Sequence, residues 1–81
     1  MANSTVMQRY ANLSGNSGVV AYGIGRDWID VKFQDGGTYR YTYESASALH
    51  IETMKKLALA GRGLSTYIAR HVQQCYASRR P

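Results

Sequence analysis

Two segments in the first half of the chain alternate between apolar and polar residues, and this alternation restricts the possible folds most. Residues 28–34 place apolar side chains at 29, 31 and 33, and residues 38–43 place tyrosines at 39, 41 and 43. Alternation with a period of two is typical of half-buried antiparallel strands. Residues 19–24 form a third strand-like run, and the Asp-Gly-Gly sequence at 35–37 predicts a hairpin between the other two. The first half therefore predicts three antiparallel strands.

The second half of the chain changes to the period of a helix. Residues 45–60 are rich in Ala, Leu, Lys and Met and contain no Gly or Pro, which predicts one helix. Gly61 and Gly63 interrupt the pattern, and an apolar stripe with helical spacing then predicts a second helix over residues 65–76. The order β-β-β-α-α predicts an α+β domain, a three-stranded antiparallel meander with two helices packed on one face.

The length of the hairpin loop decides which way the tyrosines point. A two-residue turn pairs Lys32 with Tyr39 and places the tyrosines on the polar face, where they would form a stacking platform for bases. A three-residue turn shifts the register by one residue and places Tyr39 and Tyr41 beside the apolar residues of the preceding strand. We favour the second register, because it separates apolar from polar residues more cleanly, and expect the tyrosines in the core.

The length of 81 residues allows one domain, and we expect that domain to span residues 17–77. Residues 1–16 are polar and predict a partly flexible segment, either loose or with a short helical turn docked on the domain. Residues 78–81 predict a basic, frayed end. The absence of a long apolar run and the single cysteine favour a cytoplasmic protein with no membrane contact.

The net charge of +5 arises entirely in the second half. Basic and acidic residues balance up to residue 44, and from residue 45 onward Glu52 is the only acidic residue. Such asymmetry favours an anionic partner, most often nucleic acid, although it can also serve solubility alone.

The best candidate anion site is the junction between the two predicted helices. There, glycines on both sides of Arg62 would let a phosphate approach the backbone at the start of the second helix. The open face of the sheet offers a second, smaller basic patch beside a tryptophan. The predicted phosphate-binding or nucleic-acid-binding residues are Lys55, Lys56, Arg62, Arg70, Lys32, Arg40 and Trp28.

No arrangement of residues predicts catalysis. His50 and His71 fall on the apolar stripes of different helices, which favours structural roles for both. Cys75 lies on the same stripe as His71, but nothing in the sequence orients the pair for nucleophilic chemistry. The acidic residues are scattered, and one cysteine excludes a Cys-rich metal site. We therefore expect a protein that is not an enzyme and that uses no cofactor and no metal.

Five short motifs in a fixed order resemble the KTSC domain, a module found at the C-terminus of some lysyl-tRNA synthetases and as free-standing bacterial and phage proteins. They are a serine-led first strand at 17–23, Phe-Gln-Asp-Gly at 33–36, Tyr-Arg-Tyr at 39–41, Gly61 and Ile68. The resemblance covers residues 17–76. It implies RNA binding, which is proposed for the family, and it marks Tyr39 and Tyr41 as a family signature, which we place in the core.

The chain departs from the family pattern at two places. Gly23-Ile24-Gly25 stands where the family tends to have Gly-Tyr-Asp, and Ser45-Ala46 replaces the usual Val-Pro before the first helix.

Together these features predict a small non-catalytic module that binds RNA or another phosphate-bearing ligand through a basic surface. Two alternatives stay open. A protein-interaction module, including a small phage-type inhibitor of a host nucleoprotein complex, would use the same surface against an acidic protein. A self-associating domain would form a homodimer through exposed edge strands.

Overall fold

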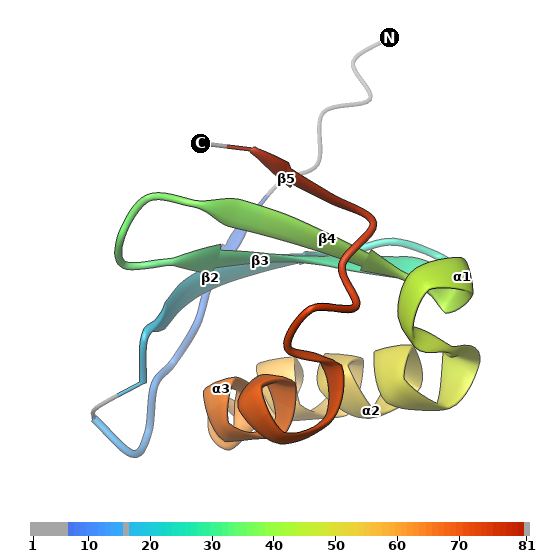
Figure 1. Ribbon diagram of the computed structural model, residues 1–81. Helices are drawn as coiled ribbons and strands as arrows, with labels where there is room; N and C mark the ends of the chain where they lie inside the picture. The colour runs from blue at the N-terminus through green and yellow to red at the C-terminus, as the bar shows by residue number, and fades with distance from the viewer. Residues whose placement is uncertain (1–6, 16, 81) are drawn as a thin grey trace, which may run out of the picture.

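The computed structural model describes residues 7–15 and 17–80 and has two layers. An antiparallel sheet forms one layer, and the helices cover one of its faces (Figure 1). In the described residues the strands lie in the order β1-β2-β3-β4-β5 and span β1 (Gln8–Arg9), β2 (Val19–Ile24), β3 (Trp28–Phe33), β4 (Thr38–Thr42) and β5 (Ser78–Arg80). The fold is therefore α+β, with an antiparallel sheet.

The sheet has five strands in the described residues, whereas the sequence predicts three. The additional strands are the two outermost, β1 beside β2 and β5 beside β4. They have two and three residues, which is too short for an alternating pattern to show. The predicted frayed end is therefore wrong for residues 78–80.

Residues 7–15 of the N-terminal segment pack against the rest of the domain. Tyr10 is 3% exposed, and its hydroxyl accepts a hydrogen bond from the Leu64 amide at 3.3 Å. The Leu13 amide donates to the Gly61 carbonyl at 2.7 Å. Residues 7–15 thus dock on the domain through the short strand β1 rather than through the predicted helical turn. The flexibility expected of residues 1–6, 16 and 81 lies outside the described residues.

The hairpin between β3 and β4 has a three-residue turn, Gln34–Gly36. The Phe33 amide donates to the Gly37 carbonyl and the Gly36 amide to the Phe33 carbonyl, each at 2.9 Å. Gly36 has a φ of 96°, the left-handed conformation that this loop length needs at its third residue. Tyr39 lies opposite Val31 and Tyr41 opposite Ile29, so the predicted register is confirmed.

The helices begin earlier and are more broken than the sequence predicts. The single helix expected over residues 45–60 is divided at Ser47, which has a φ of 85° and caps the second piece. The second predicted helix ends at Val72 after a π-helical turn, instead of reaching residue 76. The elements are α1 (Tyr43–Ala46), α2 (Ala48–Ala60), α3 (Leu64–Tyr67) and the π-helix η1 (Ile68–Val72).

These breaks explain why some residues that the sequence places in the core are exposed in the structure. Tyr43, expected on a strand, is the first residue of α1 and is exposed. His71 and Cys75, expected on an apolar stripe, are exposed because the helix changes its period at residue 68 and ends at residue 72. The core between the layers contains Ile29, Val31 and Tyr41 from the sheet and Ile51, Met54, Ala58, Leu64, Ile68 and Val72 from the helices.

Candidate nucleic-acid interface

The sheet face opposite the helices carries a row of basic side chains. Directly opposed residues of neighbouring strands point to the same side of a sheet. Because Val31 faces the helices, its neighbour Lys32 faces away from them. From β1 to β5, the row that contains Lys32 reads Arg9, Ala21, Lys32, Thr38 and Arg80. We call this side of the sheet the outer face. The row collects cations from both ends and the middle of the chain.

A buried carboxylate anchors the next row of the outer face. Asp30 is fully buried, and its two oxygens accept hydrogen bonds from Arg40 Nε at 2.7 Å and Arg40 Nη2 at 3.0 Å. Arg80 Nη2 reaches the same carboxylate at 3.3 Å. The hydrogen bond to Asp30, reinforced by the carboxylate charge, raises the pKa of Arg40 above its usual value. Arg40 is therefore not free to bind a phosphate with its whole guanidinium group.

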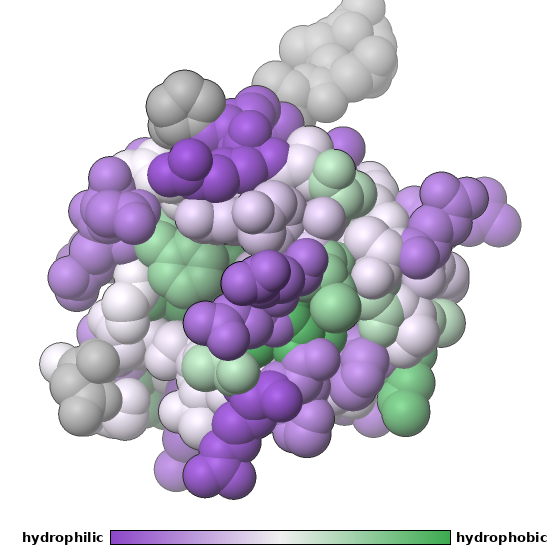
Figure 2. Space-filling view, in the orientation of Figure 1, coloured by the Kyte–Doolittle hydropathy of each residue, from purple (hydrophilic) through white to green (hydrophobic). Residues whose placement is uncertain are grey.

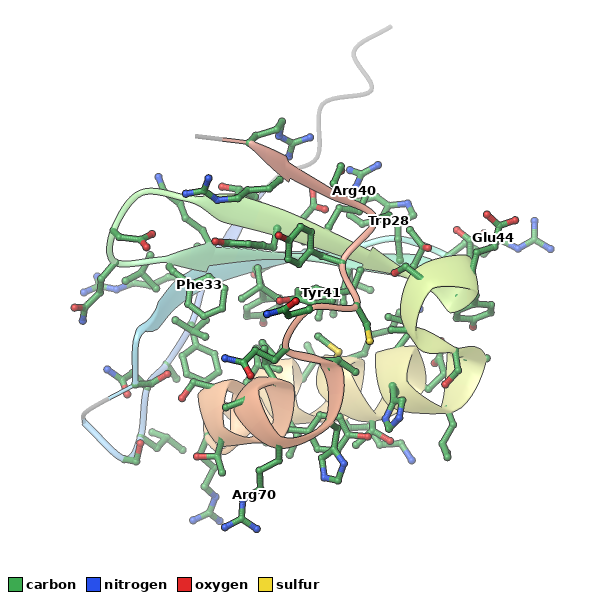
Figure 3. All side chains as sticks on the ribbon, in the orientation of Figure 1. Trp28, Phe33, Arg40, Tyr41, Glu44 and Arg70 are labelled. Carbon is green, nitrogen blue, oxygen red and sulfur yellow. The ribbon has the colours of Figure 1, made fainter. Side chains whose placement is uncertain are left out.

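Trp28 belongs to the same cluster of side chains. The Arg40 guanidinium carbon lies 3.9 Å from the centroid of the indole ring, and Figure 3 shows both side chains on the outer face. The ring also covers Gly25 so closely that a Cβ there would lie 2.0 Å from Trp28 Cε2. Glycine at 25 thus allows the indole to lie against the backbone, half-buried, beside a planar cation.

The outer face is positive despite the buried carboxylate. Arg9, Lys32, Arg40 and Arg80 lie on it with Asp30 as the acidic residue. The side chains of Arg40 and Arg80 are 31% and 58% exposed, so part of each guanidinium group stays accessible. Lys32, Arg40 and Trp28 are among the predicted site residues, whereas Arg9 and Arg80 are not, because β1 and β5 are too short to show a strand pattern in the sequence.

The junction of the helices is less open than the sequence predicts. Lys55 Nζ donates to the Arg26 carbonyl at 2.8 Å and to Glu52 at 2.9 Å, and its side chain is only 13% exposed. Gly61 is buried against Ala11, so its backbone offers no cradle for a phosphate. Hydrogen bonds from the Tyr43 hydroxyl and Lys55 lower the pKa of Glu52.

The remaining predicted basic residues lie apart from the outer face. Lys56, Arg62 and Arg70 are exposed and belong to the helical layer and its loops. Figure 3 shows Arg70 below the helices and Arg40 with Trp28 above the sheet. The structure therefore divides the predicted set between two sides of the molecule.

A groove that the sequence does not predict opens where the inner side of the β3–β4 hairpin meets the last helical turns. Its volume is about 450 Å³. Tyr39 lies edge-on to Phe33 and to Tyr76, with ring centroids 5.4 Å and 4.8 Å apart. The lining residues are Phe33, Asp35, Tyr39, Tyr41, Ser65, Ile68, Ala69, Gln73, Gln74 and Tyr76. We call this the aromatic groove.

Tyr39 and Tyr41 have different environments in this groove. Tyr41 is 1% exposed, and burial raises the pKa of its hydroxyl to about 12. Tyr39 is half-buried and packs at the edge of the core. The predicted core position is thus confirmed for Tyr41, while Tyr39 contributes both to the core and to the wall of the groove.

Two histidines meet a tyrosine on the helical side. His50 Nδ1 lies 2.6 Å from the Tyr67 hydroxyl, and the rings of His50 and His71 stack with centroids 5.7 Å apart. No carboxylate hydrogen-bonds these groups in the described residues. In the part of the chain that the structure describes, no group of three or more His, Cys, Asp or Glu side chains is placed to hold a metal ion.

Comparisons with protein-family models, curated proteins and solved structures find no match to this chain. The resemblance to the KTSC domain therefore stays a prediction. Within residues 7–15 and 17–80, no helix is long and apolar enough to cross a membrane.

Proposed function

We propose that this chain is a small non-catalytic module that binds single-stranded RNA through the outer face of its sheet. The main support for this proposal is the row of cations formed by Arg9, Lys32 and Arg80. This row lies beside Arg40, which stacks on Trp28. These three cations lie on alternate strands, so their backbones are about 10 Å apart across the sheet. Long flexible side chains at that spacing can contact several phosphates of one extended strand.

The chemistry of the outer face suits a nucleic acid better than an acidic protein. Stable protein interfaces use apolar anchors in a desolvated centre. The largest apolar group on this face, Trp28, is half-buried and already contacts Gly25 and Arg40. A planar guanidinium stacked on an indole can instead stack with an unpaired base. The resemblance to the KTSC domain points to the same ligand.

Self-association through the sheet edges has less support. The edge strands β1 and β5 have two and three residues, and β5 carries Arg79 and Arg80. Short, charged edge strands discourage pairing with a second sheet.

The test compares two double charge reversals by fluorescence anisotropy with a labelled single-stranded oligoribonucleotide. The double variant Arg9→Glu with Lys32→Glu reverses two charges on the outer face. Neither the Arg9 nor the Lys32 side chain forms a hydrogen bond or ion pair with another described residue. Lys56→Glu with Arg62→Glu makes the same charge change on the helical side and is the control. We expect the first variant to lose more than about tenfold in affinity and the control to lose several-fold less.

Salt dependence provides a second criterion. With three or four phosphates neutralised, wild-type affinity should fall roughly 20- to 50-fold between about 50 and 200 mM salt. Absence of binding, or an equal loss in the two variants, would show that the outer face is not the RNA site. If the control variant alone lost affinity, the junction of the helices predicted from the sequence would be the site.

A further inference from the structure

The aromatic groove has the lining expected of a site for a flat aromatic ring. The apolar part of its lining consists of Ile68 and four aromatic residues, Phe33, Tyr39, Tyr41 and Tyr76. Figure 2 shows hydrophobic surface between the sheet and the helices, bordered by hydrophilic side chains. Clefts of about 300–1,000 Å³ are typical of small-molecule sites, and the volume of about 450 Å³ falls in that range.

The rim of the groove carries groups that can hydrogen-bond the edge of such a ring. Gln73 and Gln74 contribute amides, Ser65 a hydroxyl and Asp35 a carboxylate. The two glutamines are exposed, and neither side chain is hydrogen-bonded to another described residue. Amides offer both donors and acceptors, which is the combination needed at the Watson–Crick edge of a base.

The strand β5 connects this groove with the outer face. Its side chains alternate, so Arg80 points to the outer face while Arg79 lies opposite Tyr39 on the inner side. The guanidinium carbon of Arg79 is 5.4 Å from the Tyr39 ring centroid, at the edge of the groove. A chain of phosphates that crosses β5 would therefore meet a cation on each side of the strand.

We propose that the aromatic groove binds one unstacked base of the RNA, while Arg79 and Arg80 contact the phosphates on either side of β5. This inference rests on the proposed function, since the same strand would continue over the outer face. The rings of the groove provide stacking and edge contacts that any base can make, and the glutamine amides add hydrogen bonds. Binding would thus depend on the bases as well as on the phosphates.

The test fills the groove without changing its charge. Ala69 lines the groove and is exposed, so Ala69→Phe places a ring inside it without altering the core. Thr66→Phe adds the same side chain nearby, at an exposed position that does not line the groove, and serves as the control. Gln73→Ala with Gln74→Ala removes the amides and provides a second variant should Ala69→Phe fail to fold, as judged by circular dichroism.

Each variant is titrated with a single-stranded RNA and with a strand of equal length that lacks bases. We expect Ala69→Phe to weaken binding of the RNA about tenfold, which corresponds to about 1.4 kcal/mol, and to leave binding of the abasic strand unchanged. The affinity of the glutamine variant for RNA should also fall, but by a smaller factor. Thr66→Phe should bind both strands with the affinity of the wild type. Equal wild-type affinity for both strands would overturn the groove inference and leave the proposed function intact.

A free nucleoside at millimolar concentration tests the groove without the phosphates. We expect it to shift the ring resonances of Tyr39 and Tyr76 in NMR spectra of the wild type but not of Ala69→Phe. Shifts confined to Trp28, or none, would overturn the inference. Failure of the RNA to bind at all would overturn the proposed function, because the outer face would then hold no strand.

Discussion

Asp30→Asn should lower the stability of the protein and raise its affinity for RNA at the same time. The carboxylate accepts two hydrogen bonds from Arg40 and one from Arg80. Asparagine keeps one acceptor, but its amide nitrogen would face a guanidinium group, donor against donor. Hydrogen bonds to charged groups contribute about 1.5–3 kcal/mol each, and removal of one partner of a buried pair leaves the other uncompensated.

The exposure of the arginines limits the loss. The side chains of Arg40 and Arg80 are 31% and 58% exposed, so water can replace part of the hydrogen bonding that the carboxylate provides. We therefore expect a total loss of roughly 2–3 kcal/mol in unfolding free energy. For a domain of this size, 1 kcal/mol changes the melting temperature by about 4–8 °C, so Tm should fall by at least about 8 °C.

The same substitution releases both arginines and removes the negative charge of Asp30 from the outer face. RNA affinity at low salt should rise several-fold, because another phosphate can be neutralised. Differential scanning fluorimetry measures Tm, and anisotropy titration measures the RNA affinity. The matched control is Asp27→Asn, which removes an exposed carboxylate from the loop before β3. An unchanged Tm would refute the energetic argument, and a weaker RNA affinity in a folded variant would refute the location of the site.

Three further predictions concern the core and Trp28. Tyr41→Ala should lower the unfolding free energy by roughly 2–4 kcal/mol in urea titrations, since the side chain is 1% exposed; a smaller loss would contradict its place in the core. Because the pKa of Tyr41 is raised to about 12, stability should be intact below about pH 10, the ordinary tyrosine value, and decline as the pH rises to about 12. Tyr41→Phe should remove that decline. Gly25→Ala should displace the indole ring and shift the fluorescence of Trp28 without unfolding the protein, because the new Cβ would lie 2.0 Å from Trp28 Cε2; an unchanged emission spectrum would show that the ring does not rest on Gly25.

The central strands could be predicted because their pattern depends on residues that are neighbours in the sequence. Alternation in residues 28–34 and 38–43 reflects which side chains face the core, and the three-residue turn follows from where glycine is available for a positive φ. The breaks in the helices could not be predicted in the same way. Ser47 adopts a φ of 85°, which its residue type does not favour, and it caps α2 through its side chain. Ser47 is exposed, and a positive φ at a serine leaves no signature in the amino-acid pattern.

The candidate sites could be predicted only in part, because both depend on pairing between distant segments. Lys32, Arg40 and Trp28 belong to strands that the sequence reveals, so their common face follows from the alternation. Arg9 and Arg80 join them through two short strands that have no sequence signature. Lys55 had been expected to bind phosphate, yet it reaches across to the Arg26 carbonyl, a contact that charge counting cannot foresee.

The C-terminal segment explains why the positive charge and the aromatic groove lie next to each other. After η1 ends, Tyr76 packs against Tyr39 and Tyr41, with ring centroids 4.8 Å and 6.3 Å apart, and the Ala77 amide donates to the Arg40 carbonyl at 2.6 Å. These contacts direct the next three residues along β4, where alternation sends Arg79 to the inner side and Arg80 to Asp30. An extended helix to residue 76 would have carried these arginines away from the sheet. The early helix end therefore creates both the groove wall and the basic edge beside it.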